Sequence, residues 1–203
     1  AGSVPPWQAA DRITNALSEA QSDLILGDPA GRSVTRATGA LSGPLRAGLA
    51  VSAPAELAGI KRQLSRARSA IEELAPVRLV AARGAITATL RRGAFRRVTE
   101  LAAQGKAAAA RPWLQIRDFR QSTRFTRVGT GATDALIALE AGDMTPGQTV
   151  LQVQQDLLDT YQSRLGTNLA EAEKAAGRKF PERLAETAAL ARGYWQIISG
   201  EYR

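Results

Sequence analysis

The sequence predicts an all-α protein, built as an antiparallel bundle of about seven to eight helices or as stacked helical hairpins. Apolar residues recur at spacings of three and four along most of the 203 residues, as on one face of a helix. β-Branched and aromatic residues are sparse, and no stretch shows sustained period-two alternation. Glycine and proline separate the periodic segments, which indicates short turns between the helices.

The first two expected helices cover residues 7–26 and 29–50. The apolar stripe of the first helix includes Ile13 and Leu17, and Gly27-Asp28-Pro29 supplies a stop followed by an N-cap and a helix-opening proline. Gly43-Pro44 lies inside the second helix, so we expect that helix to kink or split there.

Similar stripes and boundary residues predict the rest of the chain. The further helices are expected over residues 53–75, 77–103, 107–120, 131–141, 146–176 and 181–203. The polar, glycine-containing stretch 121–130 is the predicted main linker. We therefore expect a single all-α domain over 1–203, with a subdivision into an N-terminal helical layer, 1–120, and a C-terminal helical hairpin, 131–203. Trp7, Trp113 and Trp195 fall on apolar stripes and are expected to be buried.

Composition excludes many kinds of catalysis and metal binding. The chain has no cysteine, which excludes disulfides, thiolate metal sites and cysteine nucleophiles. It also has no histidine, the commonest general base and zinc ligand, so a Ser-His triad is impossible. No uninterrupted apolar run approaches the roughly 18–20 residues that a membrane helix needs. We therefore expect a protein that is not an enzyme and that holds no cofactor.

The positive charge is concentrated in one segment. Lysine and arginine number 27 against 19 acidic residues, which gives a formal charge of +8. Residues 78–127 hold twelve basic residues and only Glu100 and Asp118 as acids, a net of +10, so the rest of the chain is at −2. A search for a partner of this surface therefore starts in that segment.

One arginine stripe runs through the sequence RPWLQIRDFRQSTRFTR, where aromatic residues alternate with basic ones. Its members are spaced three, four and three apart: Arg117, Arg120, Arg124 and Arg127. The favoured interpretation is structural, because guanidinium groups form bidentate pairs with carboxylates such as Asp134, Asp156 and Asp159 on later helices. An anionic lipid or envelope polymer is the second interpretation. Nucleic acid is the least favoured partner.

A second basic group surrounds Phe95. It consists of Arg91, Arg92, Arg96 and Arg97. We expect these side chains, together with Arg78 and Arg83, to give the helix over 77–103 a largely basic exposed side. This side is either an ordinary solvated face or a docking surface for anionic headgroups or an acidic protein.

Carboxylates are the only plausible metal ligands in a chain without histidine and cysteine. The weak candidates are Asp156, Asp159, Glu182 and Glu186, which form pairs at spacings of three and four on helices. Oxygen-only sites suit hard cations such as Ca²⁺, Mg²⁺ or Fe³⁺. The favoured interpretation is ordinary solvated helix charge, so no metal site is predicted.

Several segments resemble the extracytoplasmic helical region that precedes the membrane domain of some bacterial Ftr-type high-affinity iron permeases. They are the arginine-aromatic stretch above, GATDALIALEAGDMTP, DLLDTYQSRL, ARGYWQII and, near the N-terminus, ALSEAQSDLILGDPA. The Arg-Glu-x-x-Glu motif of that family's membrane helices is absent, so no iron ligand is carried over and iron is implied only as context.

The resemblance implies a non-enzymatic accessory or docking module in iron uptake. It implies a location in the periplasm or cell envelope, with membrane association through a partner or through a membrane segment outside this chain. The N-terminal Ala1-Gly2-Ser3 is compatible with a mature end after signal-peptide removal or with a cloning remnant. The expected partner is a membrane permease domain or another envelope protein. The alternative is a structural subunit of an envelope assembly that binds an anionic partner through its basic surface.

Overall fold

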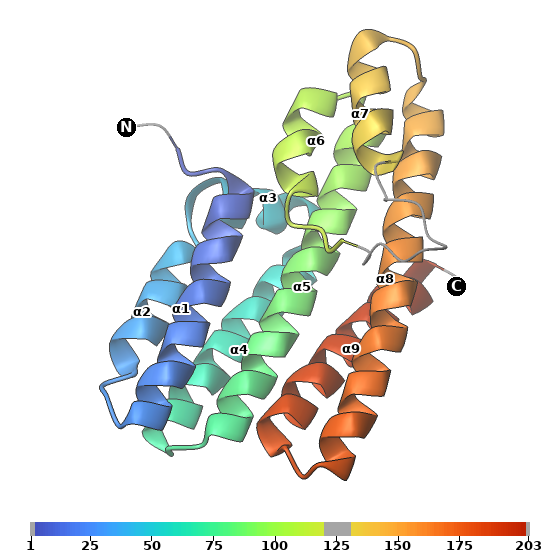
Figure 1. Cartoon of the computed structure of the whole chain (residues 1–203). Coiled ribbons are helices and arrows are strands. Elements are labelled where there is room, and N and C mark those ends of the chain that lie inside the picture. The colour runs from blue at the N-terminus through green and yellow to red at the C-terminus, as the bar shows by residue number, and fades with distance from the viewer. Residues whose placement is uncertain (1–2, 120–130, 202–203) are drawn as a thin grey trace.

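The all-α prediction is confirmed. The computed structural model describes residues 3–119 and 131–201, where nine helices and no strand occur (Figure 1). The predicted linker 121–130 lies outside the described residues. The helices are α1 (Pro6–Leu26), α2 (Gly31–Ala40), α3 (Gly43–Ser52), α4 (Pro54–Glu72), α5 (Pro76–Ala103), α6 (Ala107–Leu114), α7 (Gly131–Ala141), α8 (Pro146–Gly177) and α9 (Pro181–Glu201).

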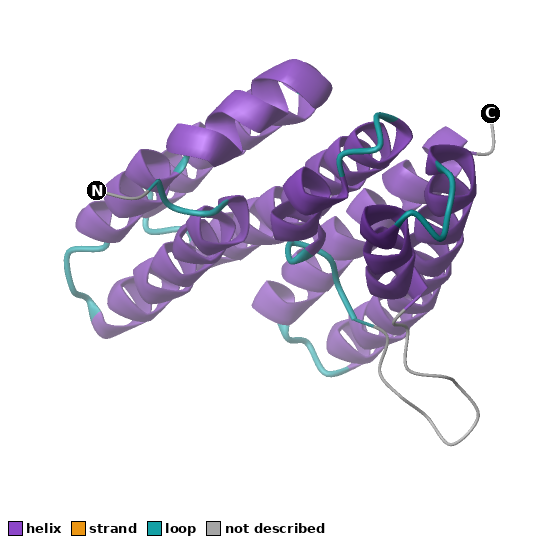
Figure 2. Cartoon of the chain, turned by 90° about the horizontal axis from the view of Figure 1, so that it is seen from above, coloured by secondary structure: helices purple, strands orange, loops and turns teal. Residues whose placement is uncertain are grey.

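Three helical hairpins set the architecture. They are α1 with α2, α4 with α5, and α8 with α9, and the first and third pack against the second (Figure 1). The view from above in Figure 2 shows only helices and connecting loops in the described part. No helix there combines the length and the hydropathy of a bilayer-spanning segment.

Helix α5 is the central element. It contacts α1, α3, α4, α6, α8 and α9, and its buried side chains lie on almost every side, among them Leu79, Ile86, Leu90 and Phe95. A helix that is apolar nearly all round is typical of a core position. The buried side chains of the other hairpins join those of α5 in one cluster.

Helices α5 and α9 run in the same direction and approach closely. Arg83 pairs with Glu186, and Arg92, further along α5, bonds to Gln196, which is further along α9. The residue numbers therefore increase in the same direction along both helices. A Cβ atom added to Gly193 would lie 2.1 Å from the Cβ of Ala88, and one added to Gly84 would lie 2.8 Å from the Glu186 carbonyl oxygen. The absent side chains of these two glycines therefore set the distance between the two helices.

One expected split is confirmed, and one predicted helix ends earlier than expected. The helix expected over 29–50 is split at Ser42, as Gly43-Pro44 suggested, and Gly43 has a φ of 54° that favours glycine. The helix expected over 107–120 ends at Leu114. Beyond it the backbone tightens, since the amides of Ile116 and Arg117 bond to carbonyls three residues back, and the Asp118 carboxylate accepts the next amide.

The prediction that all three tryptophans are buried is wrong for two of them. Trp113 is 5% exposed, whereas Trp7 is 37% and Trp195 58% exposed. On α9 the buried face is set by Tyr194, so the next residue points about 100° away from it.

The close contact of α5 and α9 is testable by exchanging one methyl group across it. Gly193→Ala should lower the free energy of unfolding by about 1–2 kcal/mol, because the overpacking cost exceeds the gain in helix propensity. The double variant Ala88→Gly/Gly193→Ala should recover most of this loss, since it again places one methyl group at the contact. Thermal melts of both variants measure the effect.

Gly166→Ala is the matched control. Gly166 lies in α8 with no atom within 4 Å of an added Cβ, so this variant should gain about 0.5–1 kcal/mol. A double variant no more stable than Gly193→Ala would contradict the proposed contact.

Candidate functional site

A largely covered carboxylate joins three helices. The Oδ2 atom of Asp118, which follows α6, lies 3.1 Å from Nη1 of Arg91 on α5 and 3.0 Å from Nε of Arg164 on α8. It also accepts a 2.5 Å hydrogen bond from the hydroxyl of Tyr194 on α9. The side chain of Asp118 is 13% exposed. One carboxylate therefore fixes α5, α8 and α9 relative to one another.

Aromatic rings enclose one side of this carboxylate. Tyr161 on α8 stacks on Tyr194 with ring centroids 5.7 Å apart, and Phe95 meets Tyr161 edge-on at 6.4 Å. The Arg91 guanidinium lies 5.6 Å from the Tyr194 ring centroid and also donates a hydrogen bond to the Tyr194 hydroxyl. These contacts cover one side of the ionic cluster, which lowers its exposure to water and strengthens its interactions.

The surroundings of the cluster shift the pKa values of Asp118 and of the two tyrosines away from neutral pH. Burial by itself would raise the pKa of Asp118, but Arg91, the Tyr194 hydroxyl and Arg164 outweigh it and hold the pKa below the ordinary value. Burial raises the pKa of both Tyr161 and Tyr194 far above the ordinary range. None of these groups exchanges a proton near pH 7, which makes the cluster unsuited to acid–base catalysis.

The first arginine of the sequence stripe, Arg117, points inward. It hydrogen-bonds to Oγ1 of Thr133 at 2.9 Å, stacks over Phe119 at 4.7 Å, and lies 3.9 Å from Oδ2 of Asp156. Burial lowers its pKa, and the carboxylate of Asp156 opposes that shift. Asp156 also accepts the Ala132 amide at 2.8 Å, so Arg117 and Asp156 together connect the turn after α6 to the start of α7. Arg120, Arg124 and Arg127 lie outside the described residues.

The second arginine group does not form the largely exposed side expected from sequence. Arg92 and Arg96 approach Oε1 of Glu56 on α4 at 2.9 and 3.5 Å, and Glu56 is almost fully buried. Arg97 bonds to the Ser52 hydroxyl at 2.9 Å. Arg91, Arg92 and Arg97 are thus mostly covered, and only Arg96, 52% exposed, faces water. The physical reason is that α5 is central, so even its polar residues contact neighbouring helices.

The carboxylates considered as metal ligands lie on α8 and α9, and two of them pair with arginines. Asp156 is beside Arg117, and Glu186 pairs with Arg83 at 2.7 Å and with Arg183 at 3.7 Å. Glu182 lies in the first turn of α9. Asp159 lies on α8 and interacts with another group, so it is not a free carboxylate. Among the residues that the structure describes, no three carboxylates gather as a metal would require.

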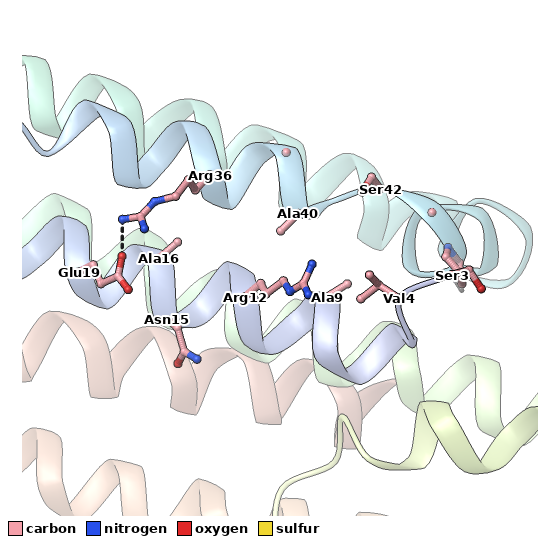
Figure 3. Close-up of a pocket in the computed structure, with 13 residues that line it drawn as sticks. Ser3, Val4, Ala9, Arg12, Asn15, Ala16, Glu19, Arg36, Ala40 and Ser42 are labelled. Carbon is pink, nitrogen blue, oxygen red and sulfur yellow. Dashed lines mark hydrogen bonds and ion pairs between the residues drawn. The ribbon is translucent and has the colours of Figure 1, made fainter. Parts of the chain in front are cut away.

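A cavity of about 610 Å³ lies between α1 and the end of α2 (Figure 3). An ion pair between Arg36 and Glu19 crosses it at one end, and the rest is lined by Arg12, Asn15 and small side chains such as Ala9 and Ala40. Both charged partners of the ion pair are more than half exposed. This arrangement is typical of a packing seam between two helices.

A second cavity, of about 790 Å³, lies between α4, α5 and α9 and is strongly basic. We call it the arginine groove, after the five arginines that line it: Arg62, Arg66, Arg78, Arg92 and Arg192. Of these, Arg78 and Arg92 belong to the basic side that the sequence predicted for the helix over 77–103. The four-residue spacing of Arg62 and Arg66 placed them on one face of a helix, but nothing in the sequence connects that face to Arg192.

The chain matches the family described as the iron permease FTR1 N-terminal domain over residues 3–203. The chain belongs to this family. The match confirms the resemblance drawn from the arginine-aromatic and tyrosine-containing segments, and the family is one of transport proteins. No curated protein and no solved structure matches the chain.

The role of Asp118 in this iron permease N-terminal domain predicts a large cost on its removal. Asp118→Asn keeps the shape of the side chain but leaves Arg91 and Arg164 without a counter-charge, so the free energy of unfolding should fall by about 3–5 kcal/mol. Denaturant unfolding measures this loss. Glu140→Gln, which breaks the exposed 2.8 Å pair with Arg111, should cost only about 0–1 kcal/mol. Equal losses in the two variants would contradict the central role of Asp118.

The buried tyrosines predict a loss of stability in alkali. A group whose pKa is higher in the folded state stabilises the fold below its unfolded pKa, about 10 for tyrosine, and that contribution is lost as the pH rises further. The thermal midpoint should therefore fall above about pH 10. Tyr194→Phe should be less stable at pH 7, because it loses the bond to Asp118, but its midpoint should fall less steeply in alkali. Parallel slopes would be inconsistent with titration of Tyr194.

Proposed function

We propose that this chain is a non-enzymatic, extracytoplasmic module that serves iron uptake by docking a partner of the permease. The observation that carries the proposal is the family match over residues 3–203. The residue types support the non-enzymatic part, since the chain has neither histidine nor cysteine. The lowered pKa of Asp118 supports it further, because this carboxylate is held ionised by its partners and is a poor proton donor or acceptor near neutral pH.

The charge distribution favours docking over iron capture. The chain carries a formal charge of +8, which repels cations at long range. Its most buried carboxylates already have guanidinium partners: Glu56 lies beside Arg92, and Asp118 lies between Arg91 and Arg164. An iron ion at either carboxylate would have to displace these cations. Iron is therefore proposed as the cargo of the transport system and not as a ligand of this chain.

The alternative proposal is a structural subunit of an envelope assembly that binds an anionic partner. The exposed arginines of the arginine groove favour a basic interaction surface under either proposal. The two differ in what the cell loses with the chain. A docking module is needed for iron uptake, whereas a structural subunit is needed for the integrity of the envelope.

Removal of residues 3–203 from the encoded protein tests the proposal. Uptake of radioactive iron at limiting concentration should fall strongly, while the envelope should keep its resistance to detergent. A protease added outside the cytoplasmic membrane should cleave the intact chain. Unchanged uptake with a weakened envelope would favour the structural alternative, and tight stoichiometric binding of Fe³⁺ to the purified chain in calorimetry would contradict the docking role.

A further inference from the structure

We infer that the arginine groove binds an extended, carboxylate-rich segment of a partner protein. The inference rests on the proposed docking function and names the surface and the chemistry of the partner. Clusters of arginine are a recurrent means of recognising acidic motifs, because each guanidinium can hold a carboxylate through two parallel hydrogen bonds.

The groove has a floor of small side chains and two basic walls. The floor is formed by α5, where Ala81, Ala82 and Ala85 leave room for another backbone. Arg62 and Arg66 stand one turn apart on the α4 wall, and Arg192 stands on the α9 wall. The groove is therefore recessed along its floor and positively charged on both sides.

The two walls present their charges to the same part of α5. A Cβ atom added to Gly59, on α4, would lie 3.5 Å from Thr89 and 3.9 Å from the Arg62 guanidinium. On the other wall Gly193, the neighbour of Arg192, packs against Ala88. Gly59 and Gly193 thus pack against adjacent residues of α5. Arg62 and Arg192 line the groove from the two helices that carry these glycines.

The arginines at the middle of the groove lack carboxylate partners. Arg78 pairs with Glu73 near one end, and Arg92 pairs with Glu56 near the other. Within residues 3–119 and 131–201, no carboxylate lies at ion-pair distance from Arg62, Arg66 or Arg192, and all three are exposed. Three guanidinium groups are therefore free to bind an anion that the chain itself does not supply.

The length and lining of the groove favour a peptide. From Arg78 to Arg92 the α5 helix advances about 21 Å, which six or seven residues of extended chain also span. No aromatic side chain is among the described lining residues, so the stacking surface that single-stranded nucleic acid needs is missing. A second copy of this chain, at +8, is a poor electrostatic partner. A flat lipid surface reaches a recessed floor less well than a peptide does.

The test measures binding of a fluorescently labelled heptaglutamate peptide to the purified 203-residue chain at low salt. The triple variant Arg62→Gln/Arg66→Gln/Arg192→Gln should bind roughly 10- to 100-fold more weakly, because three guanidinium–carboxylate contacts are lost. Binding to the unaltered chain should weaken as salt is added. A neutral peptide of the same length should not bind.

A matched control separates the groove from the overall charge. Arg12→Gln/Arg32→Gln/Arg178→Gln removes three exposed arginines that do not line the groove and lowers the formal charge by the same amount. This variant should lose less than about threefold in affinity, since only the long-range field changes. Equal losses in the two triple variants would overturn the inference, as would failure of the peptide to bind the unaltered chain.

Two further probes test whether the groove binds a lipid surface or a nucleic acid instead of a peptide. Anionic phosphatidylglycerol vesicles and a single-stranded oligonucleotide of equal charge are measured with both triple variants. Groove-dependent binding of either probe that exceeds that of the peptide would overturn the choice of an acidic protein segment. These measurements need no permease, so they can fail while the uptake experiment succeeds, and a loss of iron uptake can be established whatever the peptide does.

Discussion

The structure depends on the close parallel contact between α5 and α9. Gly84 and Gly193 leave out the side chains that would hold the two helices apart, and Ala88 fills the remaining space. Once the backbones are this close, Arg83 can reach Glu186 and Tyr194 can reach Asp118. The C-terminal hairpin is thereby joined to the first six helices through apolar packing and buried polar contacts together, which fixes the groove between α4, α5 and α9 as a permanent feature of the surface.

Arginine has two distinct roles in this chain. In the interior, Arg91, Arg164 and Arg117 connect helices to carboxylates, and their planar groups combine charge pairing with stacking on Tyr194 and Phe119. Buried pairs of this kind are costly to break but contribute little net stability compared with an apolar core, so their effect is mainly to specify which helices meet. On the surface, unpaired arginines keep their charge available for a partner. Within the described residues, arginine therefore both balances carboxylates locally and supplies positive charge to the surface.

Much of the fold was predictable from sequence, and less of the site. The three-four stripes predicted the helices and Gly43-Pro44 predicted the split between α2 and α3, because both signals are local. The early end of α6 was missed, since it depends on a carboxylate that other helices hold in place. The outward position of Trp195 could not be predicted either. Apolar residues lie on two faces of this helix, and the sequence does not show which face is buried. The groove could not be predicted, because Arg62 and Arg192 lie on helices separated by more than a hundred residues. A local sequence pattern does not show that two such helices lie side by side.

The parallel pairing of α5 and α9 also has a consequence for folding. Neighbouring parallel helices need a long return path, which the 32 residues of α8 supply, and the contacts between them connect positions 103 residues apart, as in the Arg83–Glu186 pair. Contacts at such separation form late, because a large loop must close before they stabilise anything. During synthesis the first six helices therefore emerge with the small-residue face of α5 uncovered. Helix α9, which is made after them, covers that face, so a chain that stops before residue 181 would expose it to other proteins.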